Sequence, residues 1–279
     1  MRFAVISNIR GNATALRAVF ADIEALPQPA EQVLCAGDIV GVGPEPNEVV
    51  DLLRQRGVDA VLGNYDDAIA YDRIGSGSDF GDQEAENADF TAIQWTRATL
   101  SAENLEFLRG LPKSVRVSPA VRGVEVKARD ANELAAEYRR TFVQRALGGA
   151  MFARPARTLG KRVTLNHGTH RALNEFVRPG TANSILGSIA SNADTDVLIS
   201  AHAGVSFKRD AHDVTFVGVG SVDGSPESAA VAEYIVLSIG EAVEIEMNRV
   251  PYDPAPQIRS LEQSGLPRSF ALRYLASSP

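Results

Sequence analysis

The most constraining feature of this sequence is a repeated order of a short apolar run, a polar loop and a segment with helical periodicity. Residues 2–7 are an apolar run of strand length, and Asn12 follows as a helix cap. The apolar residues after it recur at helical spacing: Leu16, Val19, Phe20 and Ile23. The order returns with a strand over 32–36 and a helix that begins at Pro46 and stops at Gly57. This order predicts right-handed parallel crossovers, with functional loops at the carboxyl ends of the strands.

The second half of the chain adds further strands. Three short apolar runs are typical of buried strands: 163–166, 196–200 and 214–219. Residues 243–248 alternate strictly between apolar and polar side chains, which indicates a strand with one face in water. Residues 75–89 are rich in Gly, Ser, Asp and Glu, which favours an exposed loop. We find neither an internal repeat nor a dividing linker, and therefore predict a single domain over residues 1–279.

Composition restricts the class of protein. A chain of 279 residues with 44% hydrophobic content can bury a sizeable core. The formal net charge of −7 makes nucleic-acid binding unlikely, since phosphate backbones favour basic surfaces. The first residues lack the pattern of a signal peptide, and no stretch approaches membrane-spanning length. We therefore expect a cytoplasmic protein without membrane contact, in which Cys35 is a buried, inert thiol.

Five short polar segments follow these apolar runs at predicted strand exits. They are Ser7-Asn8-Ile9-Arg10-Gly11-Asn12, Gly37-Asp38, Gly63-Asn64-Tyr65-Asp66, His167-Gly168 and Ala201-His202-Ala203-Gly204. Each is weak by itself, because Gly-Asp is a common turn and a lone buried histidine is usually a hydrogen-bonded core residue. Both histidines follow strand-like runs, so we expect them to point toward a common edge. The order of the five segments therefore carries the functional interpretation.

In this order the segments resemble the calcineurin-like metallophosphoesterases, especially their small bacterial phosphodiesterase-like branch. That family has Asp-x-His, Gly-Asp, Gly-Asn-His-Asp, His and Gly-His-x-His at these places. The resemblance implies an α/β fold, a four-layer α/β/β/α sandwich of two mixed sheets. It covers most of the chain and leaves residues 118–159 as a basic, helical insertion. This insertion is interpreted as a solvated lid or dimer contact, or else as a patch that attracts an anionic ligand.

The resemblance also implies a reduced metal site. Four residues match the ligands of the family's second metal: Asp38, Asn64, His167 and His202. Three residues stand where the family has ligands of the first metal: Asn8, Arg10 and Gly204. One carboxylate, one amide oxygen and two imidazoles suit a borderline divalent ion, so the expected cofactor is one ion of Mn, Fe, Ni or Zn. The alternative is a site without metal.

Three residues are candidate catalytic groups: Arg10, Tyr65 and Asp66. Replacing a dication and an anionic ligand by Arg10 and neutral Asn8 keeps the local formal charge near about +1, so Arg10 can still attract phosphate. The alternative is that Arg10 only forms a salt bridge with Asp38 and closes the pocket. Tyr65 replaces a family histidine, and a phenol with a reference pKa near ~10 is a poor match for proton transfer at neutral pH. Asp66 is a candidate to orient Tyr65.

A late segment also departs from the family pattern. The family carries Gly-Ser-Val-Gly-x-Pro-Arg, whereas residues 220–226 are followed here by Glu227. The resemblance therefore implies that a phosphate-facing cation is missing at this place.

Two function classes follow for the site. The leading hypothesis is a metallophosphoesterase homologue with a single-metal site and weak or specialised hydrolysis of a phosphodiester or nucleotide-like substrate. The alternative is an inactive pseudoenzyme that binds a phosphorylated ligand or a protein partner in the same cleft. A third possibility is an interaction protein whose basic insertion is the working surface. The expected partner is a phosphorylated small molecule or nucleotide-like ligand, while enzymatic activity and the oligomeric state stay open.

Overall fold

Two five-stranded sheets form the centre of the molecule, in a computed structural model that describes residues 1–78, 80–117, 161–225, 228–240 and 242–275. The first sheet has the order β10 (Val243–Pro251), β9 (Val231–Ile239), β1 (Arg2–Ile6), β2 (Gln32–Cys35) and β3 (Asp59–Ala60). The second has the order β4 (Ser114–Val117), β5 (Val163–Asn166), β6 (Val197–Ser200), β8 (Val214–Gly218) and β7 (Phe207–Ala211). Both sheets are mixed, because β1–β2–β3 and β5–β6–β8 run parallel and the other neighbours pair antiparallel.

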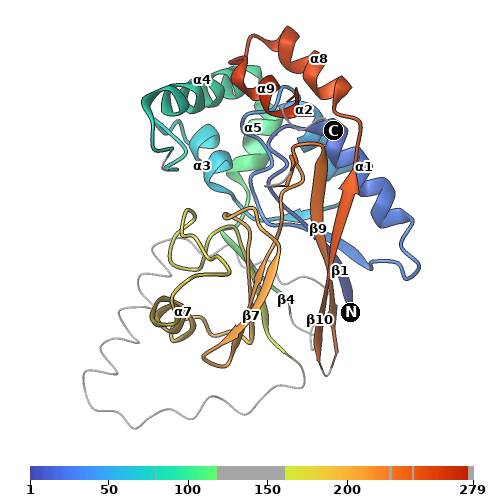
Figure 1. Cartoon of the computed structure of the whole chain (residues 1–279), viewed down its shortest axis with the longest axis vertical. Helices are drawn as coiled ribbons and strands as arrows, with labels where there is room; N and C mark the ends of the chain where they lie inside the picture. Colours follow the sequence, from blue (N-terminus) through green and yellow to red (C-terminus); the bar gives the residue numbers. More distant parts are fainter. Residues whose placement is uncertain (79, 118–160, 226–227, 241, 276–279) are drawn as a thin grey trace.

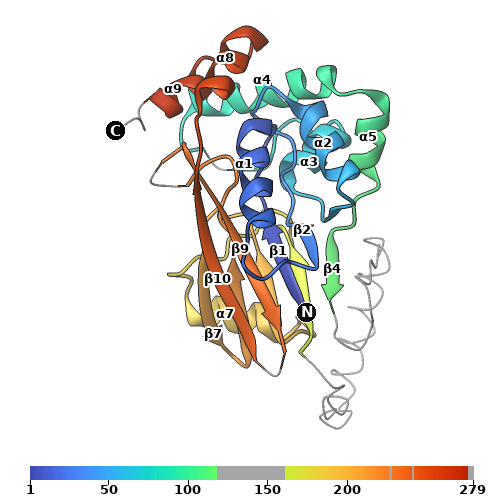
Figure 2. The ribbon, with the colours of Figure 1, turned by 90° about the vertical axis from the view of Figure 1, so that its right-hand side faces the viewer.

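Helices cover the outer faces of the sheets and one end of the sandwich (Figure 1). The first group is α1 (Ala13–Glu24), α2 (Pro46–Gln55), α3 (Asn64–Ala70), α4 (Gln83–Thr99) and α5 (Ala102–Arg109). The others are α7 (Asn183–Ala190), α8 (Ala255–Ser264) and α9 (Ser269–Leu275). In Figure 1, α7 and α1 lie on opposite sides of the two sheets, and Figure 2 shows the helical end from the side. The molecule thus has the predicted four layers.

Successive side chains of β1 point to opposite faces of the sheet and pack into two different apolar clusters. Phe3 and Val5 belong to the apolar cluster between the two sheets, whereas Ala4 and Ile6 belong to the cluster under the helices. A strand covered on both faces must be apolar throughout, which explains the continuous run at the amino terminus. The second sheet has its own outer cluster against α7, which includes Leu198.

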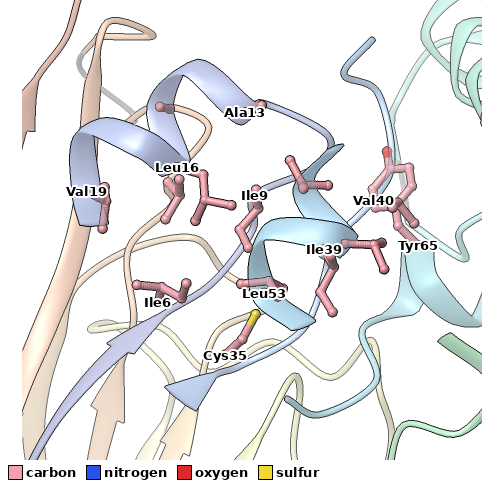
Figure 3. Close-up of a cluster of buried hydrophobic side chains, with 14 of the residues drawn as sticks. Ile6, Ile9, Ala13, Leu16, Val19, Cys35, Ile39, Val40, Leu53 and Tyr65 are labelled. Carbon is pink, nitrogen blue, oxygen red and sulfur yellow. The ribbon is translucent and has the colours of Figure 1, made fainter. Parts of the chain in front are cut away.

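The largest cluster joins the first sheet to its helices, and Figure 3 shows part of it. Ile6 and Cys35 from the strands face Leu16 of α1 and Leu53 of α2 in this view. Cys35 is fully buried as expected, and burial raises the pKa of its thiol. Tyr65 lies at the edge of the same cluster (Figure 3), so the fold ties a candidate site residue to the core.

Most expected elements are confirmed. The predicted strand over 163–166 coincides with β5, and the predicted strand over 214–219 differs from β8 by one residue. Asn12 caps α1, since its side-chain oxygen accepts a hydrogen bond from the Ala15 amide at 2.9 Å. The strand predicted over 243–248 is longer in the structure, because it pairs along its whole length with β9.

Two expectations need correction or stay open. Residues 75–89 are not a loop throughout, because Asp82 caps α4 and Asp89 is buried within that helix. A surface helix can be rich in polar residues, and composition alone does not reveal its buried face. The predicted helical insertion at 118–159 lies outside the described residues. Among the helices of the described ranges, none combines the length and apolar character that a bilayer crossing requires.

Candidate functional site

The candidate site lies where loops from the carboxyl ends of both sheets meet. Its polar side chains come from the loop after β1, the loop after β2, the start of α3, and the loops after β5 and β6. In the same order they are Asn8 and Arg10, Asp38, Asn64, His167 and His202. All except Arg10 are buried, with exposed fractions of 6% or less. The polar side chains predicted from the sequence therefore lie together at the carboxyl ends of the strands.

Three of these residues have strained backbones. Asn8, Arg10 and Asp38 have φ angles of 50°, 50° and 55°, in the left-handed region. Such a conformation costs a non-glycine residue about 1–3 kcal/mol and is enriched at functional sites. Backbone bonds hold it here, since the amide of Asn8 donates to the carbonyl of Gly37 at 3.0 Å and that of Arg10 to the carbonyl of Asp38 at 2.9 Å. The two loops are thus locked together.

Two glycines allow the loops to approach so closely. A Cβ atom on Gly63 would lie 2.1 Å from the amide nitrogen of Asp38, and one on Gly37 would lie 2.8 Å from the backbone of Gly63. Both contacts are shorter than real Cβ contacts, and backbone atoms cannot rotate away. Asp38 and Asn64 can therefore lie in one site only because both positions lack a side chain.

The four residues predicted as metal ligands place their donor atoms close together. The Nε2 atom of His167 lies 2.8 Å from the Oδ1 atom of Asn64 and 3.4 Å from the Oδ1 atom of Asp38. The Nδ1 atom of His202 lies 3.2 Å from the same Nε2 atom. His167 is thus at the centre of the four.

His167 has one ring proton but two neighbouring oxygens that each require a donor. Burial lowers the pKa of His167, so the ring is neutral near pH 7 and carries one proton. Its Nδ1 atom lies 2.8 Å from the carbonyl of Ala36, and its Nε2 atom lies 2.8 Å from the amide oxygen of Asn64. The amide nitrogen of Asn64 donates to the carbonyl of Ser76 at 2.9 Å, which fixes the orientation of this amide. One ring nitrogen therefore faces an oxygen with no proton between them.

A divalent cation would remove this mismatch. It would take lone pairs from Nε2 and the Asn64 oxygen, while Nδ1–H donates to a backbone carbonyl, as metal-bound histidines usually do. Ligands at about 2.0–2.2 Å from one ion lie about 3.0–3.5 Å from each other, close to the distances seen here. His202 is also suited, because burial and then His167 lower its pKa to about 4 and keep it neutral. The donor set therefore fits a metal ion.

The fit of a metal ion to this site depends on the side-chain amide of Asn64. In the described part of the chain, no three His, Cys, Asp or Glu side chains form a metal-binding group by themselves. The shortest distance at the centre of the site runs to Asn64, whose amide oxygen is a ligand type outside those four residue types. The donor distances around His167, and the missing proton between its Nε2 atom and the Asn64 oxygen, therefore support a metal ion at this place.

Arg10 lies on the other side of Asp38. Its Nε atom is 3.5 Å from the Oδ2 atom of Asp38, an ion pair without the geometry of a hydrogen bond. Its Nη2 atom donates to the side-chain oxygen of Asn8 at 3.1 Å. The Arg10 side chain is 26% exposed, whereas Asp38 is fully buried. The guanidinium thus forms the predicted salt bridge and still reaches solvent.

Tyr65 is a buried phenol beside these charges. Its backbone amide donates to the Oδ1 atom of Asp38 at 3.0 Å, and the Cζ atom of Arg10 lies 5.5 Å from its ring centroid. Burial raises the pKa of Tyr65 well above its ordinary value, and Arg10 only partly offsets this. The charge of Asp89 and a hydrogen bond to its carboxylate also raise this pKa, so the hydroxyl keeps its proton at neutral pH and acts as a hydrogen-bond donor, with Asp89 as one acceptor.

Asp66 holds backbone rather than ligands. Its carboxylate accepts hydrogen bonds from the amides of Ile39 at 2.9 Å, Val40 at 3.1 Å and Gly63 at 3.0 Å. Burial and then the charge of Asp38 raise the pKa of Asp66 to about 7. These bonds fix the loop that carries Asp38, and an orienting role toward Tyr65 stays a prediction.

Two groups near the site were not predicted from the sequence. The ring of Phe176 lies 4.2 Å from the ring of His202, and the guanidinium of Arg178 lies 4.1 Å from the Phe176 centroid. Ser76 accepts the hydrogen bond from Asn64 that orients its amide. Neither lies in one of the five short segments that carry the resemblance. A Phe-x-Arg sequence in a loop has no distinguishing spacing, so only the folded chain reveals its position.

Gly204, which the resemblance places at a further ligand position, has space around it. Among the described residues a Cβ atom there would meet the side chain of Ser221 alone, at 3.9 Å, although its φ of 62° disfavours other residues. Position 204 therefore has space for a larger side chain, but its backbone conformation favours glycine.

Comparisons with known proteins show the family and the fold of this chain. The sequence profile of the calcineurin-like phosphoesterase superfamily domain matches residues 1–242. An uncharacterized protein of Methanocaldococcus jannaschii is 37% identical over 115 residues, which are 39% of this chain and only 41% of that relative. A metallophosphoesterase from Sphaerobacter thermophilus has a TM-score of 0.64 at 22% identity, with 100% of this chain and 99% of that chain covered. A hypothetical protein from Pyrococcus horikoshii OT3 has a TM-score of 0.70 at 19% identity, with 98% and 97% covered.

Proposed function

Because the chain belongs to the calcineurin-like phosphoesterase superfamily, we propose that it is a phosphoesterase homologue with a reduced site for one divalent metal ion. The ion would be held by Asp38, Asn64, His167 and His202. The proposed substrate is a phosphodiester or nucleotide-like phosphoester, which the protein hydrolyses weakly or with narrow specificity. The observation that supports this most is the neutral His167 ring, whose two nitrogens both face oxygens at 2.8 Å.

The residues around the ion divide the remaining tasks. A divalent ion in such a site acidifies water and offsets charge on phosphoryl oxygens. Arg10 orients the phosphoryl group, because its guanidinium is partly exposed and its Nη2 atom is anchored to Asn8 at 3.1 Å. Tyr65 donates a hydrogen bond to a phosphoryl or leaving oxygen, since its raised pKa keeps the proton in place. Asp66 holds the loop of Asp38 in position through its three backbone hydrogen bonds.

One observation favours a second candidate function, binding without turnover. Arg10 lies 3.5 Å from the Oδ2 atom of Asp38, so that oxygen already faces a cation. In the two-metal mechanism a hydroxide bridges both ions, and a guanidinium cannot take that part. Tyr65 also has a pKa too high for proton transfer near pH 7. These features support a pseudoenzyme that binds a phosphorylated ligand.

Metal content tests the first proposal. Protein loaded with Mn²⁺ or Zn²⁺ and then dialysed is expected to keep about one equivalent of metal. Asp38→Asn keeps an acceptor for the Tyr65 amide but removes the charge, and we expect it to lose most of the metal. Asp210→Ala, an exposed acidic residue on β7, is the control and keeps its metal. Equal metal content in wild type and Asp38→Asn, or none in either, overturns the proposed site.

Turnover then separates the two candidate functions. Hydrolysis of bis(4-nitrophenyl) phosphate by the metal-loaded wild type, lost in Asp38→Asn, supports the enzyme. Stoichiometric metal without hydrolysis of this or related phosphoesters supports the pseudoenzyme.

A further inference from the structure

A loop beside the metal ligands brings an aromatic and a basic side chain to the rim of the site. This loop, residues 168–182, connects β5 to α7 and is called the rim loop below. The Phe176 ring stacks on His202 with 4.2 Å between centroids and a 36° interplanar angle. The Arg178 guanidinium lies over the Phe176 ring at 4.1 Å. The three side chains form a stack that leads from a proposed metal ligand outward to solvent.

The rim loop is anchored on both sides of this stack. Val177, between the two stacking residues, is buried in the apolar cluster under α7. A tight turn follows, in which the Arg178 amide donates to the Thr181 hydroxyl at 2.8 Å. On the other side, the amide nitrogen of Asn174 donates to the carbonyl of Gly77 at 3.1 Å. Gly77 follows Ser76, which orients Asn64, so the rim loop is tied to the metal-ligand loops.

Charge distinguishes Arg178 from its neighbour on the rim loop. Arg171 pairs with Glu175, and the same carboxylate accepts from Thr169. For Arg178, by contrast, we find no carboxylate partner within the described residues, and its side chain is exposed. A guanidinium stacked on a ring uses its face, while its N–H donors point outward in the plane. Those donors match the oxygens of a phosphate group.

We propose that Arg178, held on Phe176, recognises a second anionic group of the substrate next to the phosphoryl group at the metal ligands. This rests on the proposed function, because it deepens the substrate class of the same site. The preferred ligand is then a phosphoester with a further phosphate, as in a pyrophosphate-type linkage or a nucleoside polyphosphate. One divalent ion, Arg10 and Arg178 together carry more positive charge than Asp38 carries negative charge. The rim of the site is therefore positive enough to favour such a ligand over a phosphodiester with a single charge.

Equilibrium binding of two simple anions tests this without requiring turnover. Calorimetry with the metal-loaded protein measures the affinity for inorganic phosphate and for inorganic pyrophosphate. In Arg178→Gln we expect pyrophosphate affinity to fall about tenfold and phosphate affinity to change less than about twofold. Arg178→Lys keeps the charge and is expected to recover part of the loss. The control is Arg268→Gln, which removes the same charge from an exposed position before α9.

A double-mutant cycle tests the stack. Phe176→Leu is expected to weaken pyrophosphate binding because the guanidinium loses its support, and Phe176→Leu with Arg178→Gln is expected to be no weaker than Arg178→Gln alone. Metal analysis of each variant checks that His202 still serves the ion. Equal losses for both anions in Arg178→Gln, or an equal loss in Arg268→Gln, overturn the proposal.

The proposal and the proposed function fail differently. A wild type that binds neither anion, with or without metal, overturns both. A wild type that prefers pyrophosphate through Arg178 but hydrolyses no phosphoester supports the recognition site and overturns only the catalysis.

Discussion

At the scale of single residues, buried polar atoms without a matching partner indicate where a ligand binds. Most buried polar groups in proteins are satisfied, so each exception needs an explanation. At His167 the missing proton between Nε2 and the Asn64 oxygen has one, because a cation would bind the lone pairs of both atoms. The Oδ2 atom of Asp38 is a second case, with Arg10 as an ion-pair partner at 3.5 Å and no hydrogen bond. Both lie within one site, as does the Nε2 atom of His202, unpartnered within the described residues, although unpartnered buried atoms also occur outside it, as at Gln257 in α8.

Another of these exceptions, His170, predicts a pH dependence. Both ring nitrogens of His170 are buried without a hydrogen-bond partner in the described residues. Burial and then the charge of Arg171 lower the pKa of His170, while Glu175 opposes this. As the pH falls below about 6.5, His170 therefore binds a proton in the unfolded chain but stays neutral in the folded protein. The stabilising contribution is complete above about pH 6.5 and is lost as the pH falls toward the lower pKa of the folded state.

We expect His170→Gln to reduce this loss. The free energy of unfolding, measured by urea denaturation between about pH 7 and 5, should fall less steeply in the variant than in wild type. The difference in slope should stay below about 1.4 kcal/mol per pH unit, the limit for one proton. Asn192→Gln, a neutral exchange just after α7, should keep the wild-type slope. An unchanged slope in His170→Gln would show that this ring takes up its proton freely in the folded protein.

At the scale of elements, the site depends on how closely three loops approach. The loop after β1 and the loop after β2 exchange backbone hydrogen bonds, and the carboxylate of Asp66 ties the second loop to the start of α3. Glycines at 37 and 63 provide the necessary space. The ligands on these loops are therefore positioned by backbone contacts before any ion binds.

Two glycine substitutions separate steric fit from backbone conformation. Gly63→Ala would place a Cβ atom 2.1 Å from the Asp38 amide, and we expect a loss of about 3 kcal/mol or more in the free energy of unfolding, together with loss of bound metal. In Gly57→Ala the new Cβ atom meets none of the described residues within 4 Å, and the φ of 62° opposes it. We therefore expect a loss of about 1 kcal/mol in the free energy of unfolding and unchanged metal content. Chemical denaturation and metal analysis measure both. Similar small losses in the two variants would contradict the close approach.

At the scale of the whole molecule, the carboxyl-terminal helices are joined to the site by a buried polar network. Asp223 accepts hydrogen bonds from Asn12 at 3.0 Å and from the Tyr274 hydroxyl at 2.7 Å, and Arg273 of α9 lies 2.5 Å from its other oxygen. The Asp223 amide also donates to the carbonyl of Asn8 at 3.0 Å. The family profile ends at residue 242, yet α9 thus supports the loop that carries Asn8 and Arg10.

Removal of the central carboxylate should test this support. In Asp223→Ala the buried Asn12 and Tyr274 lose their acceptor, and Arg273 loses its ion pair. We expect the free energy of unfolding to fall by about 3 kcal/mol. Thermal or urea denaturation measures it, with Asp210→Ala on exposed β7 as the control. A loss as small as that of the control would mean that α9 is only loosely attached.

The sequence by itself determined the fold class and where the chemistry gathers. Apolar runs followed by polar loops fixed β1, β2, β5 and β6, because strand periodicity and burial are written locally in the residues. Since parallel strands of one sheet end at one edge, the same pattern gathered Asp38 with Asn64 and His167 with His202, and the packing of the two sheets brought these pairs together. The helix over 83–99 was missed in part, because its polar composition hides the face that buries Asp89.

Only the tertiary structure decided how these side chains meet. The mismatch at His167 arises because its single proton faces two oxygens, those of Ala36 and Asn64, which lie 131 and 103 residues away along the chain. The stack of Arg178, Phe176 and His202 and the link from α9 to the β1 loop likewise join distant segments. Such contacts depend on distances of a few tenths of an ångström between separate elements, and no local periodicity encodes them.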